Sequence, residues 1–67
     1  AKEGELALLL VRLYRSLDAL VGNDEARRLA WMRSPNDALG GVPATLILSA
    51  QGLVAAVAYL DAMRAPV

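Results

Sequence analysis

Apolar residues recur at helical spacing through the first third of the chain. Between Glu5 and Val21, leucines stand at positions 6, 10, 13, 17 and 20. These intervals place side chains on one helical face, so the pattern predicts an α-helix from Glu5 to Val21. Leu9, Val21 and Tyr14 widen the apolar stripe to roughly 160°, more than the ~100° that a single core contact needs. Gly22 comes next, and a glycine at this position predicts a left-handed helix end.

A second helix is predicted after a short polar step. Asn23 is a favoured N-cap residue, and the acidic residues that follow it suit the positive end of a helix dipole. Asp24 has the spacing to pair with Arg27 and Arg28. The helix is expected to end before Pro35, because a proline disfavours α geometry in the residue that precedes it.

The connection SPNDALGGVPATLI, residues 34–47, has the composition of closely specified backbone. Ser34 suits an N-cap, Pro35 a first helical position and Asp37 the third, which predicts a single helical turn that ends at Gly40. Gly40 and Gly41 are expected to supply positive φ or close backbone approach, and Gly41 is expected to be closed to a residue with a Cβ. We interpret this connection as the element that fixes the angle between the helices on either side.

Two more helical segments are predicted after the glycines. Pro43 holds Val42 extended and begins a short helix that is expected to reach Leu48. Ser49 is expected to cap a final helix from Ala50 to about Arg64. The fold class predicted for residues 1–67 is therefore all-α: one domain, a small bundle of about five helical segments.

The final helix is apolar on every side, although it is too short to cross a membrane. A chain of 67 residues has little with which to surround such a helix, so we predict self-association as a homodimer. Gly52 inside this helix costs roughly 1 kcal/mol relative to alanine, which indicates that another backbone passes close there. The residues predicted to carry self-association are Leu53, Val54, Val57, Ala58 and Tyr59.

Composition supports a binding module and excludes several kinds of chemistry. The apolar fraction is 57%, the formal net charge is zero, and the chain has neither cysteine nor histidine. We therefore predict no catalytic, cofactor-binding or metal-binding residue, because the commonest bases, thiol nucleophiles and metal ligands are missing. A neutral segment is not expected to contact nucleic acid, and the apolar excess indicates a protein partner. No secretory signal or membrane span is recognised, so the expected location is the cytoplasm.

Three runs of the sequence resemble the toxin-binding domain of the Xre/MbcA/ParS antitoxin family: RLYRSLDALVG, EARRLAWMRSPNDALGGVPATLI and SAQGLVAAVAYLDAMR. That family's pattern has a helix that ends at glycine, then Ala-x-x-Trp-Leu, Pro-Asn, and Leu-Gly-Gly with a proline two residues on. A leucine-rich helix and Glu-Gly precede its last helix. The residues at the matching places are Trp31, Pro35, Asn36, Leu39, Gly40, Gly41, Pro43, Leu46 and Gly52. Trp31 is expected to be either a core residue or an interface anchor.

The resemblance implies a dimerising all-α antitoxin module that binds a RES-domain toxin, an enzyme that consumes NAD. In such systems the C-terminal end of the antitoxin approaches the toxin's active site. The candidate toxin-facing tail is Met63, Arg64, Ala65, Pro66 and Val67. It departs from the Arg-Ile-x-x-Gly ending that is frequent in the family, because Ala62 stands at the arginine position and Pro66 at the glycine position.

Family members usually carry an N-terminal helix-turn-helix that binds their own promoter. The chain lacks this segment and begins without Met, so we expect it to be a domain excised from a longer protein. The alternative to an antitoxin is the dimerisation domain of a helix-turn-helix regulator that has no toxin partner. A RES-domain protein encoded in the neighbouring reading frame would favour the antitoxin.

Overall fold

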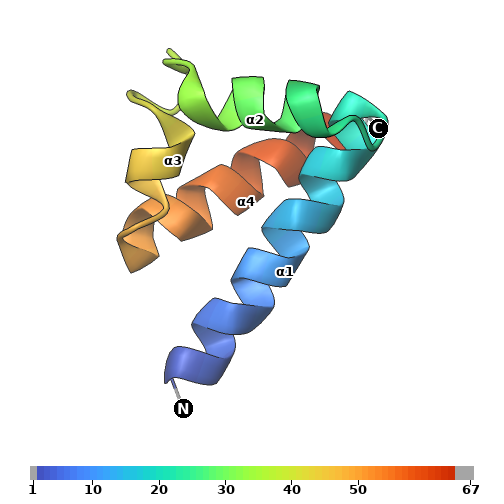
Figure 1. Ribbon diagram of the computed structural model, residues 1–67. Coiled ribbons are helices and arrows are strands. Elements are labelled where there is room, and N and C mark those ends of the chain that lie inside the picture. Colours follow the sequence, from blue (N-terminus) through green and yellow to red (C-terminus); the bar gives the residue numbers. More distant parts are fainter. Residues whose placement is uncertain (1, 65–67) are drawn as a thin grey trace.

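The computed structural model describes residues 2–64 and folds them into four helices (Figure 1). These are α1 (Lys2–Val21), α2 (Glu25–Arg33), α3 (Pro43–Leu46) and α4 (Ala50–Arg64). The all-α fold predicted from the sequence is confirmed. The number of helical segments is smaller than predicted, because residues 35–40 form a turn without a helix.

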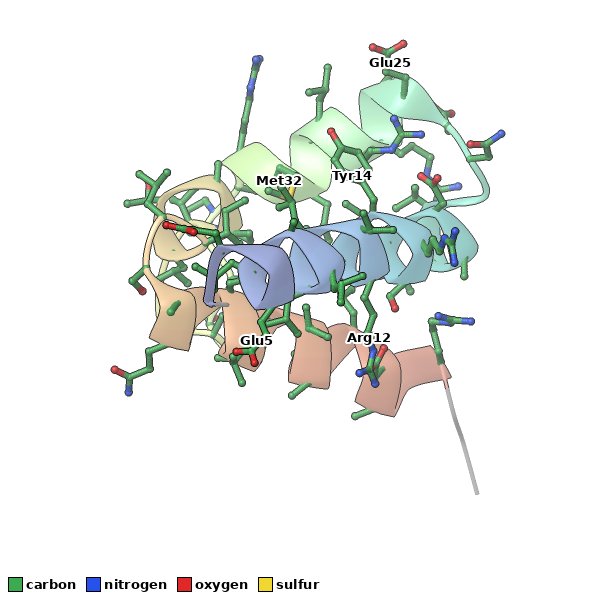
Figure 2. All side chains as sticks on the ribbon, turned by 90° about the horizontal axis from the view of Figure 1, so that it is seen from below. Glu5, Arg12, Tyr14, Glu25 and Met32 are labelled. Carbon is green, nitrogen blue, oxygen red and sulfur yellow. The ribbon has the colours of Figure 1, made fainter. Side chains whose placement is uncertain are left out.

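The long helix α1 organises the fold. It packs mainly against α4 and, on another side, against α2, as the view from below shows (Figure 2). The short helix α3 connects α2 to α4 and contacts both. The N-terminal half of α1 extends beyond the other helices (Figure 1), so its apolar residues receive little cover from the described part of the chain.

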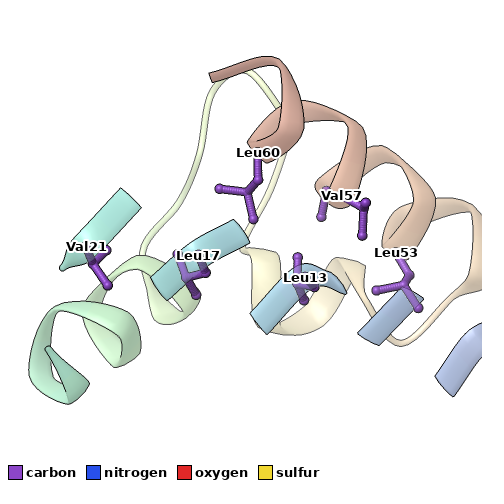
Figure 3. Close-up of a cluster of buried hydrophobic side chains, with 7 residues drawn as sticks. Leu13, Leu17, Val21, Leu53, Val57 and Leu60 are labelled. Atoms are coloured by element: carbon purple, nitrogen blue, oxygen red, sulfur yellow. The ribbon is translucent and has the colours of Figure 1, made fainter. Parts of the chain in front are cut away.

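The core lies along the contact between α1 and α4. Leucine and valine side chains of the two helices face one another there (Figure 3). Burial of each large aliphatic side chain contributes roughly 1.5–3 kcal/mol, which makes this contact the main source of stability. Its buried members are Leu13, Leu17, Val21, Leu53, Ala56, Val57 and Leu60.

The corner between α1 and α2 is built from two residues with positive φ. Gly22 has φ +72°, as predicted for a helix end, and its N–H donates to the Asp18 carbonyl at 2.9 Å. Asn23 also has positive φ (62°) and is not the N-cap that the sequence pattern predicted. Asp24 is the N-cap, and its side chain accepts a hydrogen bond from the Arg27 N–H at 3.2 Å. The prediction was one residue early because the left-handed end of α1 takes up two residues.

The Arg28 side chain, on α2, contacts residues of α1 and not residues of its own helix. Its Nε lies 2.8 Å from Asp18 Oδ1, and its guanidinium carbon lies 5.6 Å from the centre of the Tyr14 ring. The predicted pairing of Asp24 with Arg27 and Arg28 side chains is wrong, because Asp24 is used as a cap and Arg28 finds a partner on α1.

Asn36 closes the connection between α2 and α3. Its backbone pairs with Gly41 in an isolated antiparallel bridge, and its Oδ1 accepts from the Leu39 N–H at 3.1 Å. The predicted helical turn with Ser34 as N-cap is therefore wrong. The Ser34 hydroxyl instead donates to the Ala30 carbonyl at 2.6 Å, at the end of α2. The turn at Asn36 forms in place of the predicted helical turn because an asparagine side chain readily mimics a backbone turn.

The two adjacent glycines have different roles. Gly40 has φ +79°, a backbone conformation that residues with a side chain rarely adopt. Gly41 is not in that conformation, and a Cβ there would make ordinary contact with the Leu46 side chain at 3.4 Å. The prediction that Gly41 is closed to a residue with a Cβ is therefore wrong, and Gly40 is the position where such a residue would be strained.

The backbones of α3 and α4 approach closely at their junction. Pro43 is the buried first residue of α3. The helix ends at Leu46, so the prediction that it reaches Leu48 is wrong. Ser49 caps α4, as predicted, and accepts from the Gly52 N–H at 3.0 Å. A Cβ built on Gly52 would lie only 1.9 Å from the Leu46 carbonyl oxygen. The prediction of a close backbone at Gly52 is confirmed, and that backbone belongs to the same chain.

Candidate partner-binding surface

The residues singled out by the family pattern come together around the connection between α2 and α4. Trp31 and Leu39 are half-buried and pack against the core. Pro43 is fully buried, while Asn36 and Gly40 shape the turn between them. Most of these residues therefore hold the backbone path from α2 to α4.

A groove lies between the end of α1 and α2, with a volume of about 460 Å³. Its apolar walls come from Leu20 and Val21 on α1 and from Trp31 on α2, and Pro35 and Asn36 form one end. Trp31 is thus a core residue on one side and a groove residue on the other. The sequence signal for the groove was weak: Trp31 lies off the apolar side of α2, beside the arc of Arg27 and Arg28.

Four polar side chains line the groove, those of Arg27, Trp31, Ser34 and Asn36, and the Ser34 hydroxyl donates to the Ala30 carbonyl. Arg27 is exposed, and within residues 2–64 its guanidinium forms no ion pair. The Trp31 indole N–H has no hydrogen-bond partner among these residues, and it is not a buried unsatisfied group. The amide nitrogen of Asn36 is also a donor, since its Oδ1 is occupied by the Leu39 N–H.

The five residues predicted to carry self-association separate into three groups. Leu53 and Val57 are buried in the contact with α1, so they have no surface to offer a second copy in this fold. Tyr59 is half-buried and packs against the core. Val54, with 51% exposure, and Ala58 are exposed. The sequence pattern could not separate these groups because nearly every residue of α4 is apolar.

The exposed face of α4 consists mainly of small, uncharged side chains. Beside Val54 and Ala58 it includes Ala55, Ala62 and the amide side chain of Gln51, all of which are exposed. Their spacing of three, four and seven residues places them on one side of the helix, opposite the core residues.

A second exposed apolar region belongs to the leucine stripe of α1, which the sequence showed to be wider than one core contact needs. Leu6 and Leu10 on the projecting half of α1 face the connection between α3 and α4, where Leu48 is 84% exposed. These side chains line a concavity of about 230 Å³. The periodicity of α1 assigned both leucines to the core stripe, but Leu6 and Leu10 remain 36% and 42% exposed beside the start of α4.

The end of α4 is held by a polar network that reaches α1. The buried Ser16 hydroxyl donates to Asp61 Oδ1 at 2.9 Å and accepts from Arg64 at 3.0 Å, while Arg12 forms an ion pair with Asp61. The Ser16 hydrogen bond lowers the pKa of Asp61 below its usual 3.8, partial burial opposes this shift, and the charges of Arg12 and Arg64 reinforce it. The network therefore stabilises the ionised form of Asp61.

The predicted toxin-facing tail is described only in part. Met63 is exposed, and Arg64 contacts Ser16 across the helix pair. Ala65, Pro66 and Val67 lie outside the described residues. Between residues 2 and 64, no group of acidic side chains has the arrangement of a metal site. No helix in the same range has the length and apolar character needed to cross a membrane.

These features define a small helical protein-binding module: an apolar exposed helix face, a donor-lined groove and a fold held by close backbone contacts. Residues 16–65 match the family model of the antitoxin Xre/MbcA/ParS C-terminal toxin-binding domain. The chain belongs to this family, which confirms the resemblance seen in the sequence. No curated protein sequence matches the chain.

Proposed function

We propose that this domain neutralises a RES-type toxin that consumes NAD, by binding it as a folded helical module in the cytoplasm. The observation that carries the proposal is the match of residues 16–65 to a family of toxin-binding domains of antitoxins. Several polar side chains of the described fold have structural roles: Asp24 and Ser49 cap helices, and Ser16 and Asp61 join α1 to α4. The RES class of the toxin rests on what the family resemblance implies.

We also propose that the domain acts as a homodimer through the exposed face of α4. Val54 and Ala58 are the residues of the predicted set that remain available for this contact. An alanine-rich face lets two helices approach closely, and a two-fold pairing covers both copies of the same patch. Association of this kind makes the melting temperature rise with protein concentration. Direct contact with nucleic acid is not part of the proposal, since the chain is neutral.

Expression of the neighbouring reading frames tests the proposed function. Each neighbour is expressed alone in a bacterial host, and growth and cellular NAD are followed. We expect one product to arrest growth and deplete NAD, and co-expression of this chain to restore both and to co-purify with that product. If no neighbour arrests growth, or if the arrest persists despite equal expression of this chain, the domain is better explained as the dimerisation part of a toxin-free regulator.

A further inference from the structure

We infer that the groove between α1 and α2 is the docking site for an acidic segment of the partner toxin, a stretch in which a carboxylate lies beside an apolar side chain. This inference rests on the proposed function, because it states where the toxin binds and what chemistry it presents. The groove and its donors are features of this chain's own structure.

The shape of the groove suits an inserted side chain. Its volume of about 460 Å³ falls within the ~300–1,000 Å³ that is usual for binding clefts. Trp31 forms part of its wall, held in place by its contact with the core. A rigid, half-buried tryptophan is the type of residue that most often dominates binding energy at protein interfaces. The groove is open to solvent and offers an apolar wall against which an anchoring side chain can pack.

The charge of the groove decides what lies next to that anchor. Arg27, the Trp31 indole and the Asn36 amide offer donors, and no acidic side chain lines the groove in the described part of the chain. Asp24, the N-cap of α2, accepts a hydrogen bond from the Arg27 backbone N–H, and neither Asp24 nor Glu25 lines the groove. A purely apolar occupant would leave these donors without partners, which costs free energy. A carboxylate satisfies them and pairs with Arg27.

The position of the groove separates it from the other exposed surfaces. All its lining residues lie between Leu20 and Asn36, inside the range that matches the toxin-binding family. The concavity around Leu6 and Leu10 is lined in part by residues that precede the matched range. The exposed face of α4 has no positively charged side chain, and its one polar group is the Gln51 amide, so it suits a second copy of the chain better than an acidic segment.

Two substitutions test the groove, each with a matched control on the same helix. Arg27→Glu reverses the charge at the groove, and Arg33→Glu makes the same change outside it. Ala30→Leu fills the groove, and Ala26→Leu adds the same bulk outside it. All four side chains are exposed, and the capping hydrogen bond of Arg27 uses only its backbone, so the variants should fold. Circular dichroism checks this.

Titration calorimetry with the toxin identified by the growth assay gives the affinity. We expect Arg27→Glu and Ala30→Leu each to weaken binding by about tenfold or more, equivalent to about 1.4 kcal/mol, and the controls to stay near the wild-type value. Trp31 is the single tryptophan, so the labelled chain has one indole N–H resonance, which should shift when unlabelled toxin binds. Toxin substitutions that restore neutralisation by the Arg27→Glu chain should replace an acidic residue.

The outcomes separate this inference from the proposed function. If the wild-type chain binds the toxin while both groove variants bind equally well, the groove inference is wrong and the antitoxin function stands. If the wild-type chain binds no neighbouring gene product, both are wrong. If the groove variants convert a dimer into a monomer, the groove is a self-association surface and the inference fails.

Discussion

Replacement of Gly52 by alanine should destabilise the fold, although the same change usually stabilises a helix. Alanine is favoured over glycine within a helix by roughly 1 kcal/mol. A Cβ at Gly52, however, would lie 1.9 Å from the Leu46 carbonyl oxygen and 2.7 Å from its carbon. Ordinary contact begins near 3.4 Å, so α3 and α4 must separate by about 1.5 Å. The atom that obstructs is backbone and cannot move by rotation of a side chain.

Separation of the two helices also disturbs the start of α4. The Leu46 carbonyl accepts from both the N–H and the hydroxyl of Ser49, and that hydroxyl accepts from the Gly52 N–H. Overpacking costs about 1–3 kcal/mol and a lost N-cap about 1 kcal/mol. After the gain in helix propensity is subtracted, we expect a net loss of about 2 kcal/mol. For a domain of this size that lowers the melting temperature by roughly 8–16 °C.

Urea unfolding at one fixed protein concentration measures this loss, with Gly4→Ala as the matched control. Gly4 also lies within a helix, but a Cβ there meets no atom within 4 Å. The control should therefore be as stable as the wild type or gain up to about 1 kcal/mol. A Gly52→Ala chain with the unfolding midpoint of the wild type or higher would refute the steric argument, provided that the slope of the transition is unchanged.

Three further predictions follow from the same structure. Gly40→Ala should cost about 1–2 kcal/mol because of its positive φ, whereas Gly41→Ala should be nearly neutral, and equal thermal melts would contradict this. The lowered pKa of Asp61 means that its network stabilises the fold above about pH 4 and is lost as the pH falls through the folded value. Acid unfolding should thus be less steep for Asp61→Asn than for the wild type, and parallel curves would exclude the network. In sedimentation equilibrium, Val54→Asp should shift a dimer to folded monomer, while Leu29→Asp, at 43% exposure on α2, should leave it intact; a wild-type monomer would end the dimer proposal.

Helix positions were predictable because each one has a local cause. The leucine spacing of α1, Gly22 at its end and Ser49 before α4 act over a few residues, and all three were recognised. Gly52 was recognised for a different reason: a glycine that weakens its own helix requires a compensating contact elsewhere. The structure supplies that contact from Leu46.

The turn between α2 and α3 was not predictable in detail because its residues compete for the same backbone groups. Ser34 and Asp37 satisfy a capping pattern, but Asn36 makes a turn that excludes a helix there. Burial along α4 was equally unresolved, since leucine, valine and alanine occupy every side of it. Only the position of α1 shows that Leu53 and Val57 face inward.

The groove could not be found from the sequence because it depends on how two helices meet. Leu20 belongs to α1 and Trp31 to α2, and their approach is set by the corner at Gly22 and by the ion pair between Asp18 and Arg28. No periodicity links these residues.

Some residues of the family pattern are needed to form the fold, and others are available to contact a partner. Asn36 and Gly40 satisfy the backbone of their own turn, and Gly52 admits the Leu46 carbonyl, so these positions are required by the fold whatever the partner. Trp31 differs, because its side chain packs against the core and its indole N–H has no hydrogen-bond partner within residues 2–64. Arg27, beside it, has no structural role for its guanidinium in the described residues. Trp31 and Arg27 stand four residues apart on α2 and line the same groove, so we expect partner choice to depend on the side chains that reach these two residues.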